Sequence, residues 1–361
     1  MTLKNFYRSN YQFIFGFIIQ DLIMKNCLWL LLFYLVIPHL SGAQTDTIAT
    51  QNQQDFITRI DDYFNLSLDL ETDFEEFEVE GSNFNYQIRP NYSFVNKLGI
   101  DYRAISIFYT FTPNFASNQD DDLKGSTESG GLGFSWNTDH LINHVETSHV
   151  KGFYLTNTAE FDNNFIEGIS PYIQFPDLDV HSFRGFHAFK WNKNFSYSAF
   201  TAQMALQTKS AGSLAAGFSY NFFKIENNTP TGQRSKNFEF LFHLPYYHTF
   251  VFNRNWFVNL GLIPGFGMVK TRLKTPVNGQ EVITKSTNLI SRINGTFGLG
   301  YNSPGLFGGI EGSANTSFQR QGESEVRQEL HGFAFRIFIG WHILAPKKIN
   351  TIYDKFEDKF L

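Results

Sequence analysis

GFAFRIFIGW, residues 332–341, alternates residue by residue between large apolar side chains and side chains that are mostly small or charged. Successive side chains of a β-strand point to opposite sides, so this stretch predicts a strand with two different faces. The apolar face carries Phe333, Phe335, Ile337, Ile339 and Trp341. The other face carries Gly332, Ala334, Arg336, Phe338 and Gly340.

The three segments before this strand repeat its pattern, over residues 256–272, 289–301 and 306–318. Short connections at 253–255 and 302–304 alternate with long polar ones at 275–286 and 320–326. Short turns at one end and long loops at the other are typical of outer-membrane barrels. We therefore predict an all-β fold, a transmembrane antiparallel up-and-down β-barrel with short periplasmic turns and longer extracellular loops.

The number of strands depends on residues 195–212, which also alternate and predict a wall strand. Phe200, Ala202, Met204 and Leu206 would face outward, opposite Tyr197, Thr201, Gln203, Gln207 and Lys209. A tight turn at 210–212 gives about 12 strands, whereas a kink within one long strand gives about 10. Both numbers are even, as in bacterial single-chain barrels.

Composition agrees with a barrel that faces lipid. Aromatic residues make up 17% of the chain and charged residues also 17%, with 42 Phe, yet mean hydropathy is slightly negative. Alternation of apolar outward and polar inward side chains produces this average. The formal net charge is −5, and no Lys/Arg-rich run occurs, so nucleic-acid binding is not expected.

The N-terminus predicts export. A basic Met24-Lys25-Asn26 precedes the apolar run 27–40, and small residues follow at 41–43, so we expect a signal peptide over 1–43, with Met24 as the start and cleavage between Ala43 and Gln44. Residues 44–60 would form a periplasmic leader, 61–343 the barrel and 344–361 a periplasmic tail. Cys27, the single cysteine, lies in the predicted signal, which excludes disulfides from the mature chain.

Polar residues on the inner faces of the last strands form the best candidate site. Arg292, Glu311 and Arg336 lie there with Asn294 and Asn315, and Lys151, Gln203, Gln207 and Lys209 are further lumen candidates. Such residues either fill a narrow lumen with paired charges or form a constriction that selects solutes. Trp191, Trp256 and Trp341 lie at strand ends, as expected of aromatic residues at the membrane interface.

Motifs for catalysis and metal binding are not found. On a strand, His140 and His144 share a face and His149 points the other way, so they do not predict a metal site. His181 and Ser182 would face opposite sides and cannot act together as base and nucleophile. The acidic run 73–80 and the loop 118–127 lack the spacing of a Ca²⁺ site. We expect no catalytic residue, metal or cofactor.

Several motifs together resemble the domain-of-unknown-function family numbered 4421. They include KGFYL at 151–155, Pro176-Asp177, FSY at 195–197, QTKSAGS at 207–213 and the aromatic segment 247–257. The resemblance covers roughly residues 60–342. It implies an exported outer-membrane-type barrel of Bacteroidota and transfers no catalytic residue, because the family has no assigned activity.

These observations predict a protein of the outer membrane of a Gram-negative bacterium, not an enzyme. Its barrel would be narrow or plugged and porin-like, with a structural role or a small-solute channel role. Outer-membrane lipid, the barrel-assembly machinery during biogenesis and a small polar solute are the expected partners, without nucleic acid. Two alternatives stay open: an outer-membrane hydrolase of the lipase type, and a soluble periplasmic β-domain that binds an apolar ligand.

Overall fold

The structure is a computed structural model of the 361-residue chain. It describes residues 56–73, 76–81, 84–113, 120–229, 232–253, 255–277, 280–320 and 327–360, all within one compact unit, Asp55–Leu361. The predicted signal peptide, its cleavage site at Ala43 and Gln44, and most of the predicted leader lie outside these residues.

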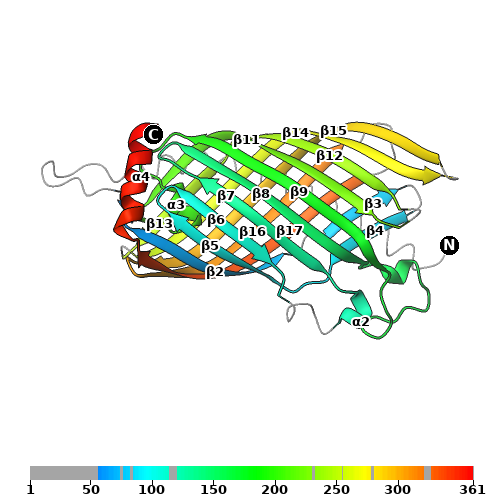
Figure 1. The fold of residues 1–361 in the computed structure, drawn as a ribbon. Coiled ribbons are helices and arrows are strands. Elements are labelled where there is room, and N and C mark those ends of the chain that lie inside the picture. Colours follow the sequence, from blue (N-terminus) through cyan, green and yellow to red (C-terminus); the bar gives the residue numbers. More distant parts are fainter. Residues whose placement is uncertain are drawn as a thin grey trace, which may run out of the picture. The chain divides into compact units, whose positions relative to one another are not determined.

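The described residues form a closed antiparallel barrel with a ring of about 12 strands (Figure 1). The chain closes on itself where its last wall strand pairs with its first, so the sheet has no free edge in this region. The prediction of about 12 strands is confirmed. The wall strands are β2 (Tyr63–Asp73), β5 (Val95–Tyr102), β6 (Ile105–Phe111), β7 (Glu128–Trp136), β8 (Leu141–Leu155), β9 (Gln174–Lys190), β11 (Ala211–Asn227), β12 (Arg234–His243) followed in the same position by β13 (Tyr246–Phe252), β14 (Trp256–Val277), β15 (Gln280–Asn302), β16 (Leu306–Arg320) and β17 (Arg327–Leu344).

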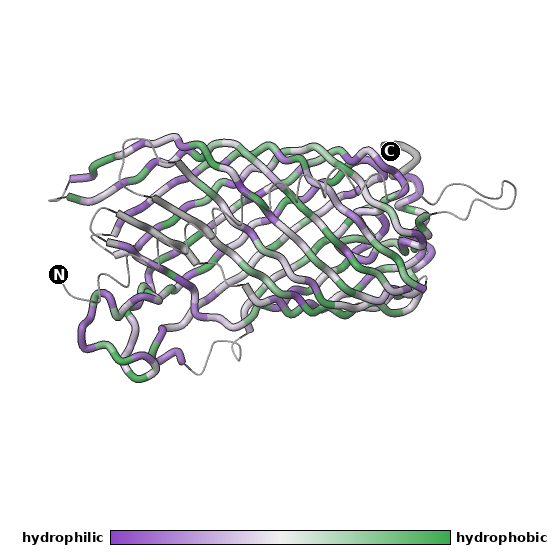
Figure 2. The backbone as a smooth tube through the Cα atoms, turned by 180° about the vertical axis from the view of Figure 1, so that it is seen from behind, coloured by the Kyte–Doolittle hydropathy of each residue, from purple (hydrophilic) through white to green (hydrophobic). Residues whose placement is uncertain are grey.

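The strand alternation read from residues 332–341 has the predicted orientation. Phe333 and Ile337 of β17 are about half exposed on the outside, while Phe338 between outward neighbours is buried inside. Figure 2 shows hydrophobic and hydrophilic residues alternating along the strands of the wall. The outer wall therefore carries a continuous set of exposed apolar side chains, which include Leu68, Ile100, Ile107, Leu132, Phe183, Phe222, Phe242, Phe266, Leu289, Phe297 and Ile310.

The two ends of the barrel differ (Figure 1). The end with short turns carries helix α4 (Lys347–Phe360), within the predicted tail. Tyr353 of α4 packs edge-on against Tyr102 with ring centres 5.3 Å apart, and Asp354 contacts Arg103 in the β5–β6 turn at 2.6 Å. These contacts fix the helix against the rim. Among the residues that the structure describes, no helix is long and apolar enough to cross a bilayer.

The opposite end carries the long connections, and one of them differs from the prediction. Residues 275–286 were predicted as a loop, but β14 and β15 extend through most of this segment and pair up to Val277 and Gln280. The polar residues of this segment fit strands that extend beyond the part of the wall that carries exposed apolar side chains. The other elements at this end are β3 (Glu76–Gly81), β4 (Phe84–Pro90), α2 (Asp121–Lys124) and η1 (Thr158–Glu160).

Residues 192–210 do not form the predicted wall strand. They leave the wall after β9 and fold into the short-turn end as helix α3 (Tyr197–Thr201) and strand β10 (Ala205–Gln207). Strand β10 pairs with β1 (Ile57–Arg59), a segment that the sequence places in the leader. We call residues 192–210 the plug.

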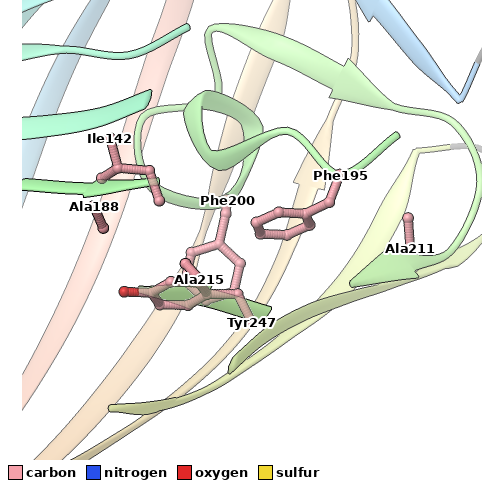
Figure 3. Packing of buried hydrophobic residues seen from close by; sticks show 7 residues of the cluster. All are labelled: Ile142, Ala188, Phe195, Phe200, Ala211, Ala215 and Tyr247. Carbon is pink, nitrogen blue, oxygen red and sulfur yellow. The ribbon is translucent and has the colours of Figure 1, made fainter. Parts of the chain in front are cut away.

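A hydrophobic core holds the plug in place (Figure 3). Phe195 and Phe200 of the plug are buried against Tyr247 of β13, with Ile142, Ala188, Ala211 and Ala215 completing the cluster. Gly261 of β14 lies beside this core: a Cβ at that position would lie 2.5 Å from Thr296 Oγ1 and 3.2 Å from the ring of Tyr247. Phe200, which the sequence predicts to face outward, is thus buried in a core inside the barrel.

Candidate functional site

A cavity of about 700 Å³ occupies the barrel above the plug. It is lined by inward-facing residues of the wall and by Tyr197, Thr201, Ala202 and Gln203 of the plug. Four basic and six acidic side chains line it, so the formal charge of the lining is negative. They are Lys97, Arg184, Arg292 and Arg336, with Asp69, Glu71, Asp101, Glu146, Glu239 and Glu311.

Arg336 is the centre of the charged cluster nearest the plug. Its guanidinium donates to Glu311 on the neighbouring strand β16 and to Asp69 of β2 at 3.3 Å. It also donates to the backbone carbonyl of Thr201 in the plug, at 3.3 Å. Arg336 and Glu311 are in register, so their pairing follows from the predicted strands. Asp69 could have been found from the same alternation in β2, since closure of the barrel places β2 beside β17.

Arg292 belongs to a separate ion pair, although the sequence grouped it with Glu311 and Arg336. Both of its terminal nitrogens donate to Glu239 of β12, at 2.8 and 2.9 Å. The sequence missed Glu239 because no pattern pairs two strands that are not neighbours in the sheet. Asn294 and Asn315 face each other in register between the two clusters.

The other lumen candidates are divided between two places, the plug and the outer face of the wall. Gln203 and Gln207 are buried in the plug, and only Gln203 lines the cavity. Lys209, also in the plug, lies over the ring of Phe56. Lys151 differs from the prediction: it is in register with Asp179 and alternates with the cavity-lining Val150, so it lies on the outer face.

Trp191, Trp256 and Trp341 all lie at the short-turn end. Each is about half exposed on the outer wall: 52%, 50% and 48% respectively. Their grouping at one level is the arrangement expected of an aromatic belt at a membrane interface.

Wall residues bind the plug through its backbone. Asn259 of β14 donates to the carbonyl of Phe200 at 2.9 Å, and both atoms are buried. Asn302 of β15 donates to Gln203 Oε1 at 2.9 Å and to the Ala205 carbonyl at 3.1 Å. Arg336 of β17 donates to the Thr201 carbonyl and Ser106 of β6 to Met204 Sδ, so the plug is held from several sides of the barrel.

Lys190 fixes the point where the plug begins. Its side chain is almost fully buried, and its ammonium group donates to the carbonyls of Asn192 at 3.1 Å and Phe195 at 2.6 Å. Gln207 fixes the other end of the plug: its side-chain amide donates to the carbonyls of Phe56, Asn194 and Lys209. An irregular segment inside a barrel needs such donors, because its carbonyls have no ladder partner.

One group of cavity residues resembles a hydrolytic arrangement. Ser135 Oγ lies 2.9 Å from His144 Nδ1, and His144 Nε2 lies 3.3 Å from Glu146 Oε2. Arg184 contacts both oxygens of Glu146, at 3.1 and 3.3 Å. The sequence did not indicate this group, since Ser135 and His144 meet only through the register of β7 and β8. As predicted, His181 and Ser182 lie on opposite faces of β9, and Ser182 contacts Ser148 instead.

Three solved structures illustrate the similarity to known barrels. The outer membrane protease OmpT from Escherichia coli is 8% identical, with a TM-score of 0.40 over 81% of this chain and 99% of that one. The toluene transporter TodX of P. putida is 10% identical, with a TM-score of 0.31 over 79% and 91%. Neisserial surface protein A (NspA) is 9% identical, with a TM-score of 0.20 over 76% and 96%. Similarity this distant transfers neither activity nor substrate.

No curated protein matches the chain. A family model does match, over residues 45–342, which is most of the sequence. Its description is "Domain of unknown function (DUF4421)", the family that the motifs at 151–155 and 207–213 resemble. The chain belongs to this family.

Proposed function

We propose that this protein is a non-catalytic outer-membrane barrel that its own plug closes at the periplasmic end. The exposed apolar side chains of the wall support a lipid environment, and the tryptophans at the short-turn end support a membrane boundary there. Because short turns are periplasmic in barrels of this type, the plug and α4 face the periplasm.

The observation that carries the proposal is the buried core between the plug and the wall. Phe195, Phe200 and Tyr247 fill the short-turn end, and buried asparagines hold the plug backbone. The cavity above the plug is then a chamber for small polar solutes rather than an open pore. Passage through the barrel would require the plug to move.

Single-channel recording in planar bilayers tests this proposal. We expect the wild-type barrel to show almost no conductance and a variant with residues 193–209 replaced by a short Gly/Ser linker to show regular steps. Because acidic side chains outnumber basic ones in the lining, the steps should favour cations. A second variant, Asn259→Ala with Asn302→Ala, weakens the plug without deleting it and should open intermittently.

Heat modifiability on a gel checks that each variant is folded. Large steady steps from the wild-type protein would overturn the proposal, because the plug would then not seal the barrel. A folded deletion variant without conductance would overturn it as well.

Ser135, His144 and Glu146 favour a second candidate, hydrolysis of an ester within the chamber. A serine, a histidine and a carboxylate in contact are the parts of a nucleophile, a general base and a group that orients the base. Labelling with a fluorophosphonate tests it: the candidate requires labelling of wild type and of a Ser219→Ala control, and none of Ser135→Ala. Absence of labelling in the wild-type protein would remove this candidate.

A further inference from the structure

Three metal-ligating side chains meet on the outer wall near the long-loop end. His149 of β8 and His181 of β9 are in register, and Asp179 is the next residue on the same face of β9. Ser148 and Ser182 beside them bond to each other at 2.7 Å and line the cavity. Because side chains alternate, both histidines lie on the face of the strands that carries the exposed Phe183, and the lining of the cavity also includes His149.

The ligand atoms of these residues have the separations of a metal site. Asp179 Oδ1 lies 2.9 Å from His149 Nε2 and 3.2 Å from His181 Nε2, and all three atoms lie within 4.8 Å of one another. Ligands about 2.1 Å from a tetrahedral Zn²⁺ ion are separated by roughly 3.4 Å. The two imidazole rings stack with centres 4.2 Å apart, which directs both Nε2 atoms toward the same carboxylate.

A second observation points to a ligand at this place. Asp179 Oδ1 and His149 Nε2 are both buried, and neither makes a hydrogen bond within the described residues despite their short separation. Buried polar atoms nearly always have a hydrogen-bond partner, so two buried atoms without one need an explanation. A cation between them would satisfy both atoms at once.

The charged residues around the cluster are of both signs. Lys224, the register partner of His181 on β11, forms an ion pair with Glu226, the register partner of Asp179. Lys151 lies beside Asp179 on the other side. Two imidazoles and one carboxylate suit Zn²⁺ and similar transition metals, whereas Ca²⁺ and Mg²⁺ take oxygen ligands.

The height of the cluster along the barrel axis makes it accessible to ions in solution. His181 precedes Trp191 by ten residues along β9. With a rise of roughly 3.4 Å per residue and a tilt of roughly 40°, the two lie about 25 Å apart along the barrel axis, the height of the apolar band. The cluster therefore lies at the outer boundary of the membrane, where ions can reach it.

We propose that His149, Asp179 and His181 bind one transition-metal dication, with Zn²⁺ as the fitting ion, and that the ion joins β8 to β9 on the outer surface. Three protein ligands leave the fourth tetrahedral position open to water. The two histidines lie on separate strands, so their spacing along the chain does not predict this site.

The test is Zn²⁺ titration of the folded, detergent-solubilised protein without an affinity tag, by calorimetry and by the visible absorption of Co²⁺ as a substitute ion. We expect one saturable site. His149→Ala and His181→Ala should each weaken binding at least about tenfold, the loss that removing even an outer-shell partner of a metal produces. Asp179→Asn should do the same.

His140→Ala is the matched control, because His140 is exposed at the opposite end of β8. It should bind Zn²⁺ like the wild type, and an excess of Mg²⁺ should not compete. Absence of a saturable site would overturn the proposal, as would unchanged affinity in the folded His149→Ala, His181→Ala double variant. Equal loss in the His140→Ala control would show nonspecific binding by surface histidines and overturn it too.

Discussion

The plug and the wall strand β15 have similar alternating sequences, but their apolar side chains lie on opposite sides of the barrel wall. In β15, Ile293, Phe297 and Leu299 are exposed on the outside of the barrel. In the plug, Phe195 and Phe200 are buried inside it, against Tyr247. The comparison shows that alternation identifies two faces of a segment but not what each face contacts. That depends on whether the segment finds ladder partners on both sides.

The plug and β15 also differ in how their backbones are hydrogen-bonded. The backbone N–H and C=O groups of β15 pair with those of β14 and, from Leu289 on, with those of β16. Within the described residues, the plug has three ladder pairs, between β1 and β10, and it depends on side chains such as Asn259, Asn302 and Lys190. The wall is therefore fixed by its backbone, and the plug by particular side chains.

Replacing one phenylalanine in each region tests this comparison most strongly. Phe195→Ala should lower the free energy of unfolding by about 3–5 kcal/mol, because it leaves a cavity in a packed core. Phe297→Ala should cost about 2 kcal/mol, the transfer contribution alone, because lipid fills the space. Denaturant unfolding from phospholipid vesicles measures both values. Equal losses at the two positions would contradict the different surroundings that we assign to them.

Removal of a buried amide tests the side-chain attachment of the plug. Asn302→Ala leaves Gln203 Oε1 and the Ala205 carbonyl without this donor, so we expect a loss of about 1–3 kcal/mol. Faster proteolysis within 192–210 should accompany it. Asn164→Ala, in an exposed loop, is the control and should change neither quantity. Protection of the plug in Asn302→Ala equal to that of wild type would contradict the proposed attachment.

We expect the smallest change in the free energy of unfolding when the surface ion pair between β1 and the turn before β8 is removed. Arg59 contacts Asp139 at 2.9 Å, and both side chains are more than half exposed. Asp139→Asn should therefore cost only about 0.2–1 kcal/mol, a difference that high salt removes. Unfolding measured at low and at high salt checks this. A loss as large as that of Asn302→Ala would mean that the plug depends on surface charge more than on buried amides.

Among the predicted site residues, those on regular strands were placed best. Arg336 and Glu311 face the lumen in register, as the alternation of β16 and β17 predicted. Lys151 was predicted as a possible lumen residue, whereas its register with Asp179 places it on the outer face of β8. Gln203 was placed on a wall strand because the plug also alternates.

The sequence by itself determined the class of fold, the outward faces of β14 to β17 and the polar character of the lumen. These properties are local, because the period of two in a strand assigns every side chain to one of two sides. Only the tertiary structure decided that residues 192–210 close the barrel, that Arg292 pairs with Glu239, and that His149 meets Asp179 and His181. These contacts join residues far apart in the sequence, and they depend on strand order, register and closure, which no local pattern contains.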